Sequence, residues 1–129
     1  MIPPHEAIER YATGDDDVHE QVRDAINDNA LPRQYFEHPV VREHGSLEDP
    51  VLPFSLFVDG VPYSQLDSVV GFWLVNMITG GRTLLAALRK RRACGCGCRG
   101  WCSFYQIFSL LKWSFWLRPI RRFLTYAMI

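Results

Sequence analysis

Two apolar runs rich in β-branched and aromatic residues constrain this 129-residue sequence more than any other feature. Residues 51–58 (VLPFSLFV) have the length and nearly continuous apolar character of a strand that is covered on both faces. Residues 68–76 (SVVGFWLVN) form a second β-rich run, and residues 79–81 (TGG) after it are a strong signal for a hairpin turn. Residues 82–88 are then the returning strand, although their Leu and Ala content favours helix. We therefore expect a three-stranded antiparallel meander.

Helices are expected before and after this meander along the chain. Val18, Val22 and Ile26 recur at helical spacing and predict a helix that ends near Asn27. Residues 31–50, with several Pro and Gly and charges of alternating sign, are expected to form an extended linker.

Near the C-terminus, residues 103–117 contain neither Gly nor Pro and are long enough for four helical turns. A narrow arc of this helix is apolar and is expected to pack on the sheet; it comprises Phe104, Phe108, Leu111 and Phe115. The predicted fold class is α+β, with short N-terminal helices, a three-stranded antiparallel meander and a long C-terminal aromatic helix.

Charge divides the chain into two unlike segments. Residues 1–50 hold twelve acids and four bases, a net charge of −8, whereas residues 51–129 hold two acids and ten bases, a net charge of +8. We expect residues 1–50 to form an acidic helical arm and linker. Residues 51–129 are expected to form a basic, cysteine-containing α+β segment. Attraction between the two would fold the arm back and mask a phosphate-binding face.

All four cysteines fall within nine residues, at the spacing C-x-C-x-C-x3-C. The N-terminus lacks a positive region followed by an apolar run, so a nuclear or cytoplasmic location is favoured over secretion and stable disulfides are not expected. Thiolates this close converge on one soft ion such as zinc if the backbone permits, and the intervening glycines supply that freedom. The candidate metal ligands are Cys94, Cys96, Cys98 and Cys102.

Three interpretations of this cluster stay open at the level of sequence. Two or three of the thiols could bind zinc with His38 or His44 completing the site. The segment could be a rigid turn with ordinary reduced thiols. The thiols could also be palmitoylated, because cysteines beside a basic run and an aromatic helix are the expected context.

A basic run precedes the cysteines, and a further arginine lies among them. Such a cluster neutralises phosphates, and the scarcity of acids after residue 50 leaves its positive field uncancelled. The segment therefore predicts nucleic-acid binding, with a solvated surface run as the alternative. Trp101 and the other tryptophans could stack on bases, although we expect these rings to be buried in the core. The candidate nucleic-acid-binding residues are Arg89, Lys90, Arg91, Arg92 and Arg99.

A membrane-associated or protein-interaction module is the competing class. Residues 100–117 are interrupted only by Lys112, but they fall short of the roughly twenty apolar residues that span a bilayer. The aromatic helix would instead lie at a bilayer surface, assisted by acylated thiols and nearby arginines. Self-association through this apolar helix is also expected. The arginines in question are Arg118, Arg121 and Arg122.

Asp59 follows the first strand and is one of two acids after residue 50. Asp-Gly is a favoured turn pair, but a carboxylate at a strand end also suits a divalent cation. The order of elements resembles the opening of a ribonuclease-H-like core. It consists of a strand ending in Asp59, a second strand at 69–75, a Gly-Gly turn, a third strand at 83–88 and then a helix. Residues 54–61 (FSLFVDGV), with the cysteine-rich segment behind them, are similar to transposase-derived proteins of the DDE type.

The resemblance implies DNA strand transfer by two metal ions, magnesium in a full-length relative, held between three acids. Only the first catalytic acid carries over, onto Asp59, because residues 68–129 contain neither Asp nor Glu. Two-metal catalysis needs several carboxylates around ions about 4 Å apart. We therefore expect a truncated, catalytically incomplete transposase-like fragment that contacts nucleic acid.

Overall fold

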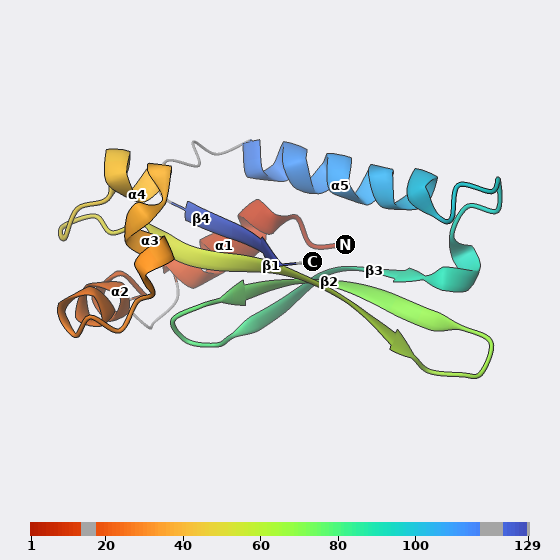
Figure 1. Ribbon diagram of the computed structural model, residues 1–129, viewed down its shortest axis with the longest axis horizontal. Coiled ribbons are helices and arrows are strands. Elements are labelled where there is room, and N and C mark those ends of the chain that lie inside the picture. Colours follow the sequence, from red (N-terminus) through yellow and green to blue (C-terminus); the bar gives the residue numbers. More distant parts are fainter. Residues whose placement is uncertain (14–17, 117–122, 129) are drawn as a thin grey trace.

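The computed structural model describes residues 1–13, 18–116 and 123–128, and it has the predicted α+β class. A four-stranded sheet in the order β3-β2-β1-β4 carries α1 and α5 on one face (Figure 1). The strands are β1 (Leu52–Pro62), β2 (Ser68–Asn76), β3 (Arg82–Arg89) and β4 (Phe123–Met128). The helices are α1 (Pro4–Thr13), α2 (Val18–Asn27), α3 (Arg33–Glu37), α4 (Pro39–His44), the short 3-10 helix η1 (Lys90–Arg92) and α5 (Trp101–Trp116).

The predicted meander is confirmed. Strands β1 and β2 pair antiparallel, β2 pairs antiparallel with β3, and β2 has the bounds that its sequence predicts. Gly80, at φ +71°, sits in the turn between β2 and β3, where a left-handed backbone favours glycine. Strand β4, which was not predicted from the sequence, pairs parallel with β1 at the edge of the sheet.

Strand β1 is longer than predicted. It continues through Asp59 and Gly60, and Asp59 pairs with Gly71 of β2, so this Asp-Gly pair is neither a turn nor a strand end. The turn lies further on, where the backbone N–H groups of Tyr63 and Ser64 each donate to the Asp67 carbonyl at 3.3 Å. The turn residues around Asp67, rather than the Asp-Gly pair, therefore end the strand.

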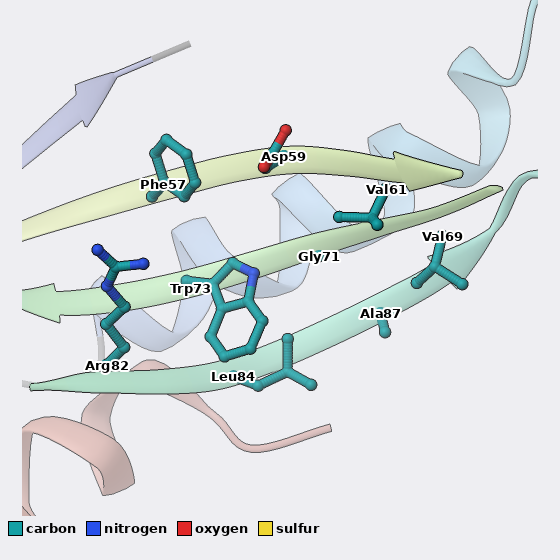
Figure 2. Close-up of a pocket in the computed structure, with 9 residues that line it drawn as sticks. All are labelled: Phe57, Asp59, Val61, Val69, Gly71, Trp73, Arg82, Leu84 and Ala87. Atoms are coloured by element: carbon teal, nitrogen blue, oxygen red, sulfur yellow. The ribbon is translucent and has the colours of Figure 1, made fainter. Parts of the chain in front are cut away.

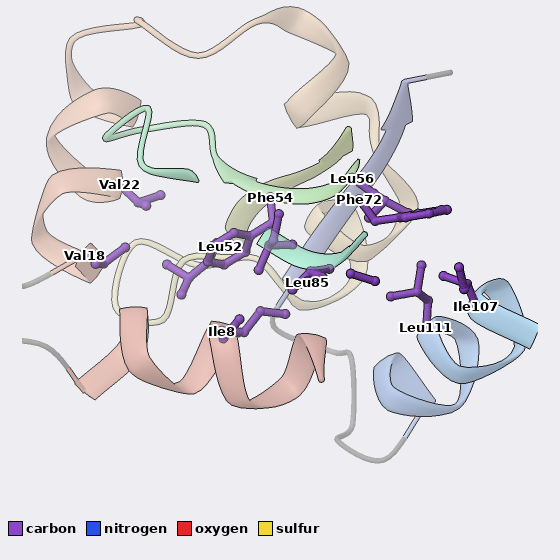
Figure 3. Close-up of a cluster of buried hydrophobic side chains, with 13 residues drawn as sticks. Ile8, Val18, Val22, Leu52, Phe54, Leu56, Phe72, Leu85, Ile107 and Leu111 are labelled. Carbon is purple, nitrogen blue, oxygen red and sulfur yellow. The ribbon is translucent and has the colours of Figure 1, made fainter. Parts of the chain in front are cut away.

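The core lies between one face of the sheet and the helices (Figure 3). Phe54, Phe72 and Leu74 from the sheet are almost completely buried, and Ile8 of α1 and Val22 of α2 pack into the same cluster. Burial of each such side chain contributes roughly 1.5–3 kcal/mol. The acidic arm thus folds back on the basic segment through apolar side chains, and both segments share one core.

The expected linker at 31–50 is wrong, because this segment contains α3 and α4. Tyr35 of α3 is 2% exposed and its hydroxyl donates to the Val51 carbonyl at 2.8 Å. Tyr35 and Val51 form a small second core against which Val41 of α4 packs. This burial overrides the local Pro and Gly signals, which favour an extended chain.

Helix α5 is long and aromatic, as predicted. Most of the predicted arc packs on the core, because Leu111 is buried and both Phe104 and Phe115 pack against the core cluster. Ile107, Leu111 and Ser114 are buried, whereas Phe108 lies at the flank with 36% of its surface exposed. Ser114 is polar yet completely buried, because its hydroxyl accepts from the His5 backbone N–H at 3.1 Å and lies 2.7 Å from His5 Nδ1. The contact with α1 therefore accounts for a polar residue on the buried side of α5.

Candidate metal centre

The loop between η1 and α5 brings the four cysteines together. Cys94, Cys96 and Cys98 lie in the loop, and Cys102 lies in the first turn of α5. Their four Sγ atoms are all within 4.8 Å of one another, and none of the thiols is in a disulfide. The convergence expected from their spacing is confirmed.

Left-handed backbone allows this loop to coil within so few residues. Gly97, Arg99 and Gly100 have φ values of +89°, +54° and +87°. A Cβ atom on Gly100 would also lie 3.4 Å from the Cβ of Ala93, so the two ends of the loop approach closely there. Glycine is the residue that adopts this backbone with least strain, which explains why glycine stands at positions 97 and 100.

Hydrogen bonds fasten the loop to the beginning of α5. The backbone N–H of Cys94 donates to Ser103 Oγ at 3.0 Å. The Trp101 N–H donates to the Cys98 carbonyl at 3.1 Å, and the Cys102 N–H donates to Cys98 Sγ at 3.4 Å. The Cys98 sulfur thus satisfies a backbone donor in the first turn of the helix, as N-cap side chains do.

The sulfur positions are close to those of a tetrahedral thiolate site. With Zn–S bonds of about 2.3 Å, the sulfurs of such a site are about 3.8 Å apart. Cys96 Sγ and Cys102 Sγ are 3.8 Å apart, and no two of the four sulfurs are more than 4.8 Å apart. Contraction by about 1 Å at most would complete the shell. Four soft sulfur donors at these distances are positioned to hold one metal ion.

The thiols influence one another's protonation. The Cys102 backbone N–H, followed by the Cys96 side chain, lowers the pKa of Cys98 to about 6. Contact with the Cys98 sulfur raises the pKa of Cys102 to about 12, and a hydrogen bond with Cys94 raises the pKa of Cys96. The thiolate of Cys98 is therefore stabilised, whereas Cys96 and Cys102 keep their protons. A bound cation would favour ionisation of all of them, because metal ligation requires thiolate.

The histidines expected to complete a mixed site lie elsewhere. His38 precedes α4 and its Nδ1 accepts from the Val40 N–H at 3.3 Å, while His44 is the last residue of that helix. Figure 1 shows α4 and the cysteine loop at opposite ends of the molecule. The four donors of the candidate site come from the cysteine loop (residues 93–100) and the first turn of α5.

The basic residues gather at the same end as the cysteines (Figure 1). All are exposed, so the acidic arm does not cover them. Arg89 is the last residue of β3, residues 90–92 form η1, and Arg99 lies in the loop between η1 and α5. The basic cluster comprises Arg89, Lys90, Arg91, Arg92 and Arg99.

Asp67 fastens this cluster to the tip of the β1–β2 hairpin. Its carboxylate accepts from the Arg91 backbone N–H at 3.0 Å and from the Tyr63 hydroxyl. Arg89 donates to the Tyr63 hydroxyl at 2.9 Å, and its guanidinium lies 5.2 Å from the centroid of the Tyr63 ring. The hydrogen bond from Tyr63 is the main cause of a lowered Asp67 pKa. The sequence signal for Asp67 was its rarity, as the second acid of the basic segment.

Asp59 lies on the sheet face opposite the core, in a shallow cavity of about 250 Å³ (Figure 2). The cavity is mainly apolar, with Phe57 and Trp73 beside Asp59 and with Arg82 as its cation. Asp59 is the single carboxylate among the described residues that line this cavity. Two metal ions require several carboxylates around them, and among the described lining residues Asp59 supplies one.

Neither protein-family models, nor curated proteins, nor solved structures match this chain. The function has to be inferred from the side chains that the fold brings together.

Proposed function

We propose that this chain is a zinc-stapled, transposase-like module that contacts nucleic acid and has no catalytic activity of its own. The observation that carries the proposal is the convergence of four cysteine sulfurs within 4.8 Å beside an exposed basic cluster. The metal would fix the loop, and the loop would present the cations.

The donor set favours zinc in a structural role. Four thiolates fill a tetrahedral shell and leave no open position for water or substrate, which is the pattern of structural rather than catalytic zinc. A zinc tetrathiolate is doubly negative, and Arg99 within the loop and the N-terminus of α5 offset that charge. Zinc would thus replace the hydrophobic core that this exposed loop lacks.

Nucleic acid is the partner that suits the basic cluster. Five exposed cations lie on one short stretch of surface, and the nearby acid, Asp67, forms an ion pair with one of them, Arg89, at 3.8 Å. A positive surface of this kind attracts phosphates through release of their counterions. Binding should therefore weaken linearly on a log–log plot against salt concentration.

The resemblance to transposase-derived proteins is compatible with the order of elements. An antiparallel meander, a helix and then a strand beside β1 follow one another, and Asp59 lies on β1. Magnesium-dependent strand transfer would need further carboxylates near Asp59. The isolated chain is therefore proposed to bind DNA without cleaving it.

Metal analysis tests the proposal first. Protein purified with reductant should hold about one zinc per chain, and Cys98→Ser and Cys102→Ser should lose it because each removes one ligand of a closed site. His44→Ala is the matched control and should retain zinc, because His44 lies at the other end of the molecule. Less than about half an equivalent in the unaltered protein contradicts the zinc site. Loss of zinc in the His44 variant contradicts the four-cysteine ligand set.

One specific observation favours membrane association as a second candidate. Trp101, Tyr105 and Trp113 on α5 are 59%, 60% and 52% exposed, with Lys112 beside them. Such a face could lie at a bilayer surface or self-associate. No helix within residues 1–13 and 18–116 is long and apolar enough to cross a membrane. The arginines expected to assist, residues 118, 121 and 122, lie outside the described residues.

Salt separates the two candidates. Binding to DNA should fall steeply with salt, whereas liposome flotation that survives high salt and is lost after hydroxylamine treatment indicates acylated thiols. The second result, in the absence of DNA binding, would replace the first candidate with the second.

A further inference from the structure

We infer that the beginning of α5 and the basic cluster together form a binding surface for single-stranded nucleic acid. This inference rests on the proposed function and specifies its partner. The surface consists of the exposed rings of Trp101 and Tyr105 and the cations of η1 and the cysteine loop. The rings would stack on unpaired bases while the cations neutralise the phosphates between them.

Loop closure places aromatic and basic residues side by side. Ala93 and Gly100 approach closely, because a Cβ atom on Gly100 would lie 3.4 Å from the Ala93 Cβ. The Cys94 backbone N–H also donates to Ser103 Oγ at 3.0 Å. Arg92 precedes Ala93 and Trp101 follows Gly100, so each is one residue from this contact. The last residue of η1 and the first residue of α5 are therefore neighbours in space.

The two rings face solvent on the same side of the helix. Trp101 and Tyr105 are four residues apart, their ring centroids are 6.3 Å apart, and both are about 60% exposed. The core contacts of α5 are made by other residues, Ile107 and Leu111 among them. Packing within the described chain thus leaves the faces of these rings available, although such rings are usually buried.

Charge and ring geometry favour single strands over duplex. Base faces are already stacked inside a duplex, so exposed aromatic rings gain contact only with unpaired bases. The basic cluster alone would bind either form through phosphates. A preference for single strands is therefore the property that the aromatic residues add.

The test compares two exposed tryptophans of the same helix. Binding of the zinc-loaded full chain is measured by anisotropy with a labelled oligothymidylate of about 15 nucleotides and with a duplex of equal length. Trp101→Ala should weaken single-strand binding at least about fivefold and leave duplex binding nearly unchanged. Trp101→Phe, which keeps a ring face, should restore most of the affinity. Trp113→Ala, about 18 Å further along the helix axis, is the matched control and should bind as the unaltered protein does.

Each outcome bears on one proposal. Equal weakening by Trp101→Ala and Trp113→Ala, or no effect of Trp101→Ala, overturns the stacking surface while salt-dependent duplex binding still supports the proposed function. No binding to either oligonucleotide overturns both. Loss of anionic liposome binding in Trp101→Ala, without oligonucleotide binding, assigns the rings to a membrane. Zinc content and circular dichroism show that the variants are folded.

Discussion

The sheet core and the cysteine loop are stabilised by different forces. In the core, Phe54, Phe72 and Leu74 are at most 1% exposed and pack beneath helices. In the loop, Cys96 and Arg99 are exposed, and the geometry depends on hydrogen bonds such as that from the Cys94 N–H to Ser103 Oγ. The core gains stability from apolar burial, whereas the loop has little apolar surface to bury.

This difference explains why the proposed metal belongs at one end of the molecule. Each net hydrogen bond contributes only about 1 kcal/mol, and ordering a loop residue costs roughly 1–2 kcal/mol of conformational entropy. A loop with positive φ at Gly97 and Gly100 therefore benefits from an ion that joins its four thiolates. The apolar core needs no such support.

The largest expected effect is in the core. Phe72→Ala removes a side chain that is 0% exposed, so the free energy of unfolding should fall by about 3–5 kcal/mol. Phe57→Ala, on the opposite face of the sheet and 39% exposed, should lower it by less than about 1 kcal/mol. Urea denaturation of both variants measures the difference. Similar losses would mean that the face carrying Phe57 is also covered.

A smaller effect is expected in the loop. Gly97→Ala places a side chain at φ +89° and should cost about 1–2 kcal/mol, or roughly tenfold in zinc affinity. Gly95→Ala is the control, because Gly95 lacks a positive φ and a Cβ there meets no atom within 4 Å. Competition with a chromophoric chelator measures both affinities. If the Gly97 variant binds as tightly as the Gly95 variant, the loop does not hold this conformation in the zinc-bound protein.

The smallest effect concerns the fastening of the basic cluster. The hydrogen bond from Tyr63 is the main cause of a lowered Asp67 pKa in the folded protein. The ionised carboxylate therefore stabilises the fold at pH values above the unfolded-state pKa of about 3.9. This stabilisation is lost as the pH falls through the folded-state pKa. Asp67→Asn should therefore be less stable than the unaltered protein at neutral pH, with the gap closing below about pH 4. Thermal melts across this range check the sign. A gap that widens on acidification would refute the ionised hydrogen-bond network.

Local patterns predicted the parts of the fold whose neighbours in sequence are also neighbours in space. Strand β2 and its Gly-Gly turn follow from β-branched residues and Gly80, and α2 follows from the spacing of Val18 and Val22. The prediction of a linker at 31–50 failed, because Tyr35 is buried in a small core with Val51, sixteen residues away, and donates a hydrogen bond to its carbonyl. A contact at that separation leaves no signature in a short window of sequence.

For the candidate metal site, the predicted cysteine ligands lie together and the predicted histidine ligands lie elsewhere. Short spacing placed the four cysteines together, because all four fall within nine residues and glycine at positions 97 and 100 permits the left-handed backbone of the loop. His38 and His44 were wrong as zinc partners, since the fold carries α4 to the opposite end. The exposure of Trp101 was also unexpected, because its sequence neighbours do not reveal which side of α5 meets the sheet.

Residue order alone determined the alternation of strand and turn, the separation of charge at residue 50 and the convergence of four thiols, because each depends on neighbours within a few residues. Only tertiary packing decided that β4 joins the edge beside β1, that α5 turns Ser114 inward and that the basic cluster is fastened by Asp67. These depend on contacts between distant segments, whose free energy is gained only when the whole chain is folded.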